Sequence, residues 1–329
     1  MRIFITGSTG FIGSALVVEL LKKQHTIHAL YRDPDKIIIR HQKLHYFKGD
    51  VGDMESLEKA MQGCTYVFHL AAYAKVWARD PRMFYRVNVT GTRNVLEVAL
   101  NLKIKRVIIT STAGVIGYSA NYEANENHFA KNDYFTEYEK TKHLAEVEVE
   151  KYNDTDLETV SLLPTRLYGP GLLSESNTLT LLIKKYIDGK WHFLPGNGKK
   201  TGNYVFIQDV IRGHINAMFK DVAGERFILG GTNIGYNNFF ATIGKVSGKK
   251  QWMLPIPVFI ILLGSGIMWL LAITLKIKPL LTPAWAKKYL HDWNVSSQKA
   301  IKKLDYSITP LEIGLEETIK WLRSKRNEL

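Results

Sequence analysis

The sequence RIFITGSTGFIG, residues 2–13, decides the fold of this protein. Arg2–Ile5 is an apolar run typical of a strand, and Phe11–Lys23 has apolar residues at helical spacing. In the loop between them, Gly7 permits a tight turn and Gly10 lets the backbone approach a pyrophosphate. Gly13 allows the helix to pack closely on the strand. The sequence therefore predicts a dinucleotide site at this helix N-terminus, made by Gly7, Thr9, Gly10, Phe11, Ile12 and Gly13.

The alternation of strand and helix patterns continues through the first half of the chain. Long helices are expected at Met83–Leu100 and Tyr134–Lys151. Further strands are expected at His25–Leu30, Leu44–Lys48, Tyr66–Leu70, Arg106–Thr110 and Thr159–Leu163, and a late one at Arg226–Leu229. Such βαβ repetition predicts an α/β protein with a doubly wound parallel sheet of the Rossmann type.

Near Arg166 the pattern changes, because glycine- and proline-rich loops separate more scattered helices. We therefore expect an NAD(P)-binding Rossmann domain over residues 1–165 and a smaller substrate-binding part over residues 166–329. Residues from about 203 to 230 are expected to return to the Rossmann domain.

Net charge, the single cysteine and the spacing of the histidines limit the classes of partner, compartment and metal site that fit this protein. The 329 residues carry a net charge of +13, but their lysines and arginines are spread out and do not alternate with aromatics, which disfavours nucleic-acid binding. Such a charge suits an anionic ligand or membrane surface. One cysteine, Cys64, excludes an intrachain disulfide, and the fold-forming strand begins at the first residues, so a cytoplasmic protein is expected. The scattered histidines show no metal-ligand spacing, so no metal is expected.

The residues after the second strand bear on the choice of cofactor. An acidic side chain there would bind the ribose hydroxyls of NAD, whereas an arginine can pair with the 2′-phosphate of NADP. The sequence reads Tyr31-Arg32-Asp33, which favours NADP through Arg32. A shifted loop would bring Asp33 to the ribose, so NAD stays an alternative.

Motifs along most of the chain resemble the extended short-chain dehydrogenases/reductases of the NAD-dependent epimerase/dehydratase family. The likeness is greatest to the branch of dihydroflavonol 4-reductase-like and hopanoid-associated sugar epimerase-like proteins. The motifs are the glycine loop, Gly49-Asp50-Val51, Phe68–Ala72, Asn88–Thr92, Ser111–Gly114, Tyr138 with Lys142, Leu163–Gly171 and Gly224–Gly231.

The resemblance implies roles for several matching residues. Asp50 and Val51 would flank the adenine, and Ala71 and Ala72 would line the cofactor cleft. Asn88 would hold the active-site helix through a backbone contact or a water. Pro164 would lie against the nicotinamide.

Tyr138 and Lys142 stand four residues apart on an expected helix and so share one face. Hydride transfer to a carbonyl requires an acid, and an ammonium close to a tyrosine should lower its pKa from about 10. The resemblance adds that the lysine also binds the nicotinamide ribose and that Thr112 binds the substrate oxygen, with Ser111 as the neighbouring alternative. Thr112, Tyr138 and Lys142 are therefore the predicted catalytic residues.

Residues 258–275 form an apolar stretch of 18 residues without a charge, within a longer segment, 254–278. If this stretch crossed a bilayer, the C-terminal segment after it would lie on the opposite side of the membrane from the active site. That C-terminal segment, however, resembles the family segment that packs on the substrate-binding part. We therefore expect a helix that lines a hydrophobic pocket or makes a peripheral membrane contact, with a span as the alternative.

The leading interpretation is an NADP-dependent oxidoreductase that transfers a hydride to or from a carbonyl or secondary alcohol of a small apolar substrate. The alternative is an NAD-dependent sugar-nucleotide epimerase or dehydratase using the same tyrosine and lysine. A cofactor-sensing module without chemistry would not need that pair. The resemblance also leads us to expect a homodimer formed through the two long helices.

Overall fold

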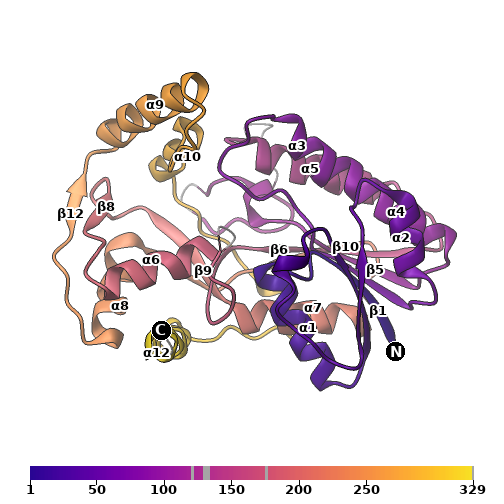
Figure 1. Cartoon of the computed structure of the whole chain (residues 1–329). Helices are drawn as coiled ribbons and strands as arrows, with labels where there is room; N and C mark the ends of the chain where they lie inside the picture. Colours follow the sequence, from indigo (N-terminus) through magenta and orange to yellow (C-terminus); the bar gives the residue numbers. More distant parts are fainter. Residues whose placement is uncertain (120–121, 129–133, 175–176, 328–329) are drawn as a thin grey trace.

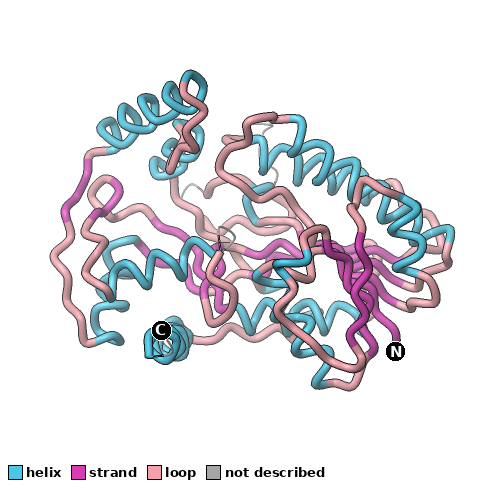
Figure 2. The backbone as a smooth tube through the Cα atoms, in the orientation of Figure 1, coloured by secondary structure: helices cyan, strands magenta, loops and turns pink. Residues whose placement is uncertain are grey.

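The computed structural model describes residues 1–119, 122–128, 134–174 and 177–327. A seven-stranded sheet with the order β10-β6-β5-β4-β1-β2-β3 forms its centre, and every pairing in it is parallel. The strands are β1 (Arg2–Thr6), β2 (Thr26–Tyr31), β3 (Leu44–Lys48), β4 (Tyr66–His69), β5 (Arg106–Thr110), β6 (Glu158–Pro164) and β10 (Glu225–Leu229). The expected parallel sheet and its late strand are confirmed (Figures 1 and 2).

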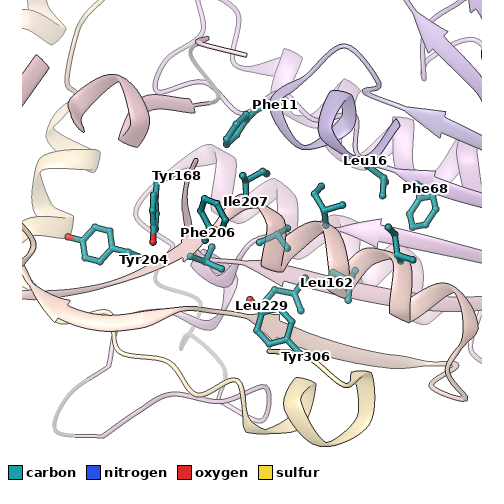
Figure 3. Packing of buried hydrophobic residues seen from close by; sticks show 14 of the residues in the cluster. Phe11, Leu16, Phe68, Leu162, Tyr168, Tyr204, Phe206, Ile207, Leu229 and Tyr306 are labelled. Atoms are coloured by element: carbon teal, nitrogen blue, oxygen red, sulfur yellow. The ribbon is translucent and has the colours of Figure 1, made fainter. Parts of the chain in front are cut away.

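Helices cover both faces of this sheet. On one side lie α1 (Phe11–Lys22) and α7 (Ile207–Phe219), and on the other lie α2 (Met54–Met61), α4 (Gly91–Asn101) and α5 (Glu137–Glu150), as Figure 1 shows. Alternate strand residues feed two separate cores, because Ile3 and Ile5 pack with α1 whereas Phe4 packs with α2 and α4. Figure 3 shows part of the first core, which includes Leu16 and Ile207.

The second half of the chain adds smaller sheets beside the large one. A three-stranded sheet contains β7 (Arg166–Tyr168), β9 (Thr201–Phe206) and β11 (Thr232–Gly235), and β8 (Phe193–Pro195) pairs with β12 (Leu254–Ile256). The helices here are α6 (Thr178–Ile187), α8 (Tyr236–Ser247), α9 (Val258–Thr274), α10 (Pro283–Lys287), α11 (Gln298–Leu304) and α12 (Leu311–Asn327).

Both long helices differ from their expected extents. The first is broken into α3 (Arg82–Tyr85), a π-helical turn η2 (Arg86–Thr90) and α4. The second begins at Glu137, three residues after Tyr134, because the Thr136 hydroxyl accepts a hydrogen bond from the Glu139 N–H at 3.2 Å and caps the helix. Interior apolar periodicity predicts a helix well, but caps and π turns decide where it begins and how it runs.

Helix α9 lies at the edge of the molecule, beside α10 (Figure 1). Of its 17 residues, all described, only Ser265 and Ala272 are buried, so most of its apolar side chains face outward and do not line an enclosed pocket. Within the described part of the chain, no helix combines the length and apolarity needed to cross a membrane.

Candidate active site

The glycine loop leaves room only for backbone. Gly7 has a φ of +69°, and a Cβ there would lie 2.7 Å from the Ala71 nitrogen. A Cβ on Gly13 would lie 2.1 Å from the Gly7 carbonyl oxygen, so the helix can approach the loop only with glycine at this position. Among the described residues, no side chain caps the first turn of α1, which leaves its N–H groups for a ligand.

The outer edge of this loop carries a charged pair. The Arg32 guanidinium lies 3.3 Å from one Asp50 carboxylate oxygen, and the other oxygen accepts the Gly52 N–H at 2.8 Å. Both charged side chains are partly exposed and can receive a ligand. Asp33 caps its own turn, because one of its carboxylate oxygens accepts the Asp35 N–H at 3.1 Å. Val51 is buried beneath Asp50.

A buried histidine joins the glycine loop to the next strand. The Thr6 hydroxyl accepts the Ala71 N–H and donates to His69 Nδ1 at 2.8 Å, and His69 Nε2 donates to the Thr92 hydroxyl at 3.0 Å. Burial and the charge of Lys142 lower the pKa of His69 to about 3, so the ring is neutral. His69 is therefore a packing residue that fixes Ala71 beside the loop.

The predicted catalytic residues come together at the carboxyl end of β5. Thr112 follows that strand, and its hydroxyl accepts the Gly114 N–H at 3.2 Å and also hydrogen-bonds the Tyr138 hydroxyl. Lys142, whose side chain is 1% exposed, donates from Nζ to the Thr110 carbonyl at 2.6 Å. Because β1, β4, β5 and β6 are parallel neighbours, the glycine loop, Ala71, Ala72, this cluster and Pro164 share one edge of the sheet.

The expected lowering of the tyrosine pKa is not observed. Burial, with a smaller contribution from the Glu139 carboxylate, raises the pKa of Tyr138 to about 12, although the Thr112 hydrogen bond acts against the increase. Lys142 does not offset this, because its ammonium is directed to the Thr110 carbonyl. Burial also lowers the pKa of Lys142 to about 8. Tyr138 is consequently a protonated hydroxyl at neutral pH.

Two polar side chains hold the catalytic elements in place. His214 of α7 accepts the Thr110 hydroxyl at 2.8 Å, which fixes the residue whose carbonyl binds Lys142. Asn88, in the π turn η2, donates to the Thr141 hydroxyl of α5 at 2.9 Å and accepts the Tyr73 N–H at 2.7 Å. The expectation that Asn88 holds the active-site helix agrees with this contact, although the partner on α5 is a side chain.

Glu139, the residue after Tyr138, makes a buried ion pair that sequence reasoning missed. The Glu139 carboxylate pairs with the Lys288 ammonium, which lies 4.6 Å from the ring centroids of both Trp285 and Trp293. Thr136 and Glu139 have the spacing of a capping box, so the sequence offered only a local role for this glutamate. A partner 149 positions away leaves no local signal.

Aromatic side chains gather near the Lys288–Glu139 ion pair. Tyr118 lies 3.9 Å from His291 between ring centroids, and Phe135 lies 5.9 Å from Trp293. Arg166 donates to the Tyr236 hydroxyl at 2.9 Å. These residues, like Lys288, were absent from the predicted site because they come from segments far apart in the chain.

The glycine loop and its surroundings fit a nicotinamide dinucleotide. Gly7 and Gly13 admit no Cβ, the helix N-terminus is uncapped by described side chains, and Arg32 provides an exposed cation at the outer edge. Pyrophosphate and ribose groups need these features. Gly7, Gly10 and Gly13 would hold the pyrophosphate, and Lys142 would hold the nicotinamide ribose.

Residues 3–230 match the sequence profile described as the NAD dependent epimerase/dehydratase family. The sterol-4-alpha-carboxylate 3-dehydrogenase (decarboxylating) of Mus musculus is 30% identical over 65% of this chain and 58% of its own length. The dihydroflavonol 4-reductase of Dianthus caryophyllus is 27% identical over 68% of this chain and 67% of its own. The UDP-glucose 4-epimerase structure from Thermotoga maritima shares the fold, with a TM-score of 0.80, 22% identity and coverage of 99% and 100% of the two chains.

Proposed function

The chain belongs to the NAD-dependent epimerase/dehydratase family and is an NAD(P)-dependent enzyme of the extended short-chain dehydrogenase type, and on this premise we propose that it is an NADP-dependent oxidoreductase. Its proposed substrate is a carbonyl or secondary alcohol of a small, apolar molecule. The observation that carries the proposal is the cluster of Thr112, Tyr138 and Lys142 on the same sheet edge as the glycine loop.

Each member of the cluster has a role that its surroundings support. The Tyr138 hydroxyl, protonated because of its raised pKa, donates a proton to the developing alkoxide during carbonyl reduction. Thr112, next to Tyr138, donates its hydroxyl proton to the substrate oxygen, which stabilises charge there. Lys142 contributes a positive charge and orients the bound ribose. The cofactor, when bound, supplies or accepts the hydride.

The preference for NADP rests on Arg32. Its guanidinium is exposed on the outer edge of the glycine loop, and the nearest alternative acid, Asp33, is engaged as a cap. An arginine binds a phosphate with charge-assisted hydrogen bonds. The apolar substrate is supported by the aromatic residues Tyr118, Phe135 and Trp293, and by relatives named for sterol and flavonol substrates.

The test is a titration with NADPH and NADH, followed by nicotinamide fluorescence, on wild type and Arg32→Ala. Lys36→Ala, a nearby exposed cation, is the matched control. Loss of one charge-assisted contact should weaken NADPH binding about 10- to 100-fold in Arg32→Ala, with NADH binding nearly unchanged. Equal affinity of wild type for both cofactors, or NAD that co-purifies, would favour the epimerase or dehydratase reaction instead.

We further propose the division into residues 1–165 and 166–329. Sheet membership supports it, because β1–β6 belong to the large sheet, whereas β7, β9 and β11 form another. Helix α7 and strand β10 on the large sheet support the return of residues near 203–230. The test is to express residues 1–165 alone. If this fragment aggregates and binds no dinucleotide, the returning segments near 203–230 are needed to complete the cofactor domain.

We also propose two partners: a peripheral membrane contact through 254–278, developed below, and a second copy bound through α4 and α5. Sedimentation equilibrium tests the homodimer. A dimer that Val147→Glu converts to a monomer would support it, because Val147 is an exposed apolar residue on α5. A monomer at micromolar concentration would contradict it.

A further inference from the structure

One stripe of helix α9 presents large apolar side chains to solvent. Phe259, Ile260, Leu263, Ile267, Leu270 and Leu271 recur at three- and four-residue spacing and are all exposed, Phe259 at 69% and Leu263 at 66%. Leaving such a continuous surface in water is unfavourable, and exposed apolar patches of this kind mark interaction sites.

The opposite side of α9 is already used by the protein. Ser265 and Ala272, seven residues apart, are its buried residues and lie on that side, and α10 is the element packed against the helix. Small residues there allow the two helices to approach. The stripe is therefore the outward side of a helix that the fold holds in place.

The charge around this stripe has one sign. Residues 227–291 contain seven lysines and no aspartate or glutamate. Lys276 and Lys278 follow α9 directly, Lys287 ends α10, and all three are exposed. Leu275 and Leu280 in the same connection are exposed too. An apolar stripe beside lysines complements lipid tails beside anionic headgroups.

We propose that this stripe docks on the surface of an anionic lipid bilayer, with α9 lying in the plane of the interface. A helix of 17 residues is about 26 Å long, which is less than the roughly 30 Å of hydrocarbon in a bilayer. The stripe enters the lipid, while α10 and the rest of the protein stay on the aqueous side.

Docking brings the active site to the membrane. Helix α10, which packs on α9, is followed by Lys288, and Lys288 pairs with Glu139 next to Tyr138, so a series of contacts joins the docked helix to Tyr138. An apolar substrate dissolved in the bilayer would then reach the aromatic side chains near this ion pair directly. This supply of substrate rests on the function proposed above, whereas docking itself does not.

Co-sedimentation with vesicles tests the docking without cofactor or turnover. Wild type should bind phosphatidylcholine vesicles containing 30% phosphatidylglycerol about tenfold more tightly than pure phosphatidylcholine, and less tightly at high salt. Leu263→Glu with Ile267→Glu should abolish binding. Ile38→Glu with Ile313→Glu, exposed apolar residues elsewhere, is the matched control and should bind as wild type does.

The contribution of the lysine charges and the insertion of α9 into the lipid are tested separately. Lys276→Gln with Lys287→Gln should reduce binding to anionic vesicles about tenfold, and Lys22→Gln with Lys59→Gln should leave it unchanged. Brominated lipid should quench tryptophan fluorescence more strongly in Leu263→Trp, which places an indole in the exposed stripe, than in wild type.

Two outcomes would overturn the proposal. One is wild type that does not bind the anionic vesicles at low salt. The other is a dimer that Leu263→Glu with Ile267→Glu dissociates and that does not bind vesicles, since a second copy would then cover α9. Vesicle binding without any carbonyl reduction would leave docking intact and overturn the proposed reaction alone.

Discussion

Helix α5 is half charged and half buried, whereas helix α9 carries no charge and is mostly exposed. In α5 the buried residues include Glu139, Lys142, Glu146 and Glu148. Buried charge and exposed apolar surface both cost free energy in folding. The two helices thus depart from the usual distribution of residues in opposite directions.

The two helices differ in whether the protein itself compensates the free-energy cost of the buried charge in α5 and of the exposed apolar surface in α9. The charged groups of α5 are compensated inside the fold: Glu139 by Lys288, Glu146 by Arg226 at 3.0 Å, and Lys142 by the Thr110 carbonyl. The apolar surface of α9 has no comparable cover among the described residues. Charged side chains that are paired inside the fold point to chemistry, and an apolar helix surface left exposed points to a partner.

The largest effect should follow from removing the acid on α5. Tyr138→Phe should lower kcat for NADPH-dependent carbonyl reduction about 10²- to 10⁴-fold, because the developing alkoxide loses its proton donor. Tyr134→Phe is the matched control, since this tyrosine stacks on His143 and lies outside the cluster. Steady-state kinetics with unchanged circular dichroism measures the effect, and equal loss in both variants would refute the assignment.

Lys142→Met should change how stability depends on pH. The pKa of Lys142 falls from 10.5 to about 8 on burial, so between these values the unfolded chain holds a proton that the folded chain has lost. Wild-type free energy of unfolding should therefore gain roughly 3 kcal/mol from pH 8 to 10.5 relative to Lys142→Met. Urea denaturation across this range measures it, and parallel curves would contradict the buried ammonium.

The pH dependence of catalysis should follow the same residue. As pH rises through about 8, Lys142 loses its charge, so kcat/KM for carbonyl reduction should fall. Nicotinamide absorbance assays from pH 6 to 10 would show the decline. A rate that stays flat to pH 10 would show that the charge of Lys142 does not contribute.

Loss of the contact between the π turn and α5 should lower the free energy of unfolding by a moderate amount. Asn88→Ala removes its hydrogen bonds to the partly buried Tyr73 N–H and the buried Thr141 hydroxyl, which should cost about 1–3 kcal/mol of stability. Asn101→Ala, at the exposed end of α4, should be nearly neutral. Equal denaturation midpoints for the two variants would exclude this contact as a support of α5.

The smallest effect on the free energy of unfolding should come from a substitution in the exposed stripe of α9. Leu263→Ser should change the free energy of unfolding by less than about 0.5 kcal/mol, because its side chain is 66% exposed. Leu96→Ala, which truncates a fully buried side chain of α4, should cost about 2–5 kcal/mol in the same urea series. A large cost for Leu263→Ser would mean that the protein itself covers α9.

The fold and the cofactor loop could be predicted from sequence because their signals are local. Gly7, Gly10 and Gly13 act through backbone geometry within one turn, and strand periodicity predicted the parallel sheet. The placement of Tyr138 and Lys142 on one helix could also be predicted, because they are separated by one helical turn, whereas their catalytic roles stay a prediction. The start of α5 and the break at η2 were missed, since a cap and a π turn override interior periodicity.

The sequence by itself determined the strands, the glycine loop and the placement of Tyr138 and Lys142 on one helix, because each depends on residues within a few positions of one another. Only the tertiary structure decided the direction of the Tyr138 pKa, the partner of Glu139 and the exposure of α9. Burial and charge neighbours depend on segments that meet in space. The physical reason is that electrostatics and solvation act through distance and exposure, and folding sets both.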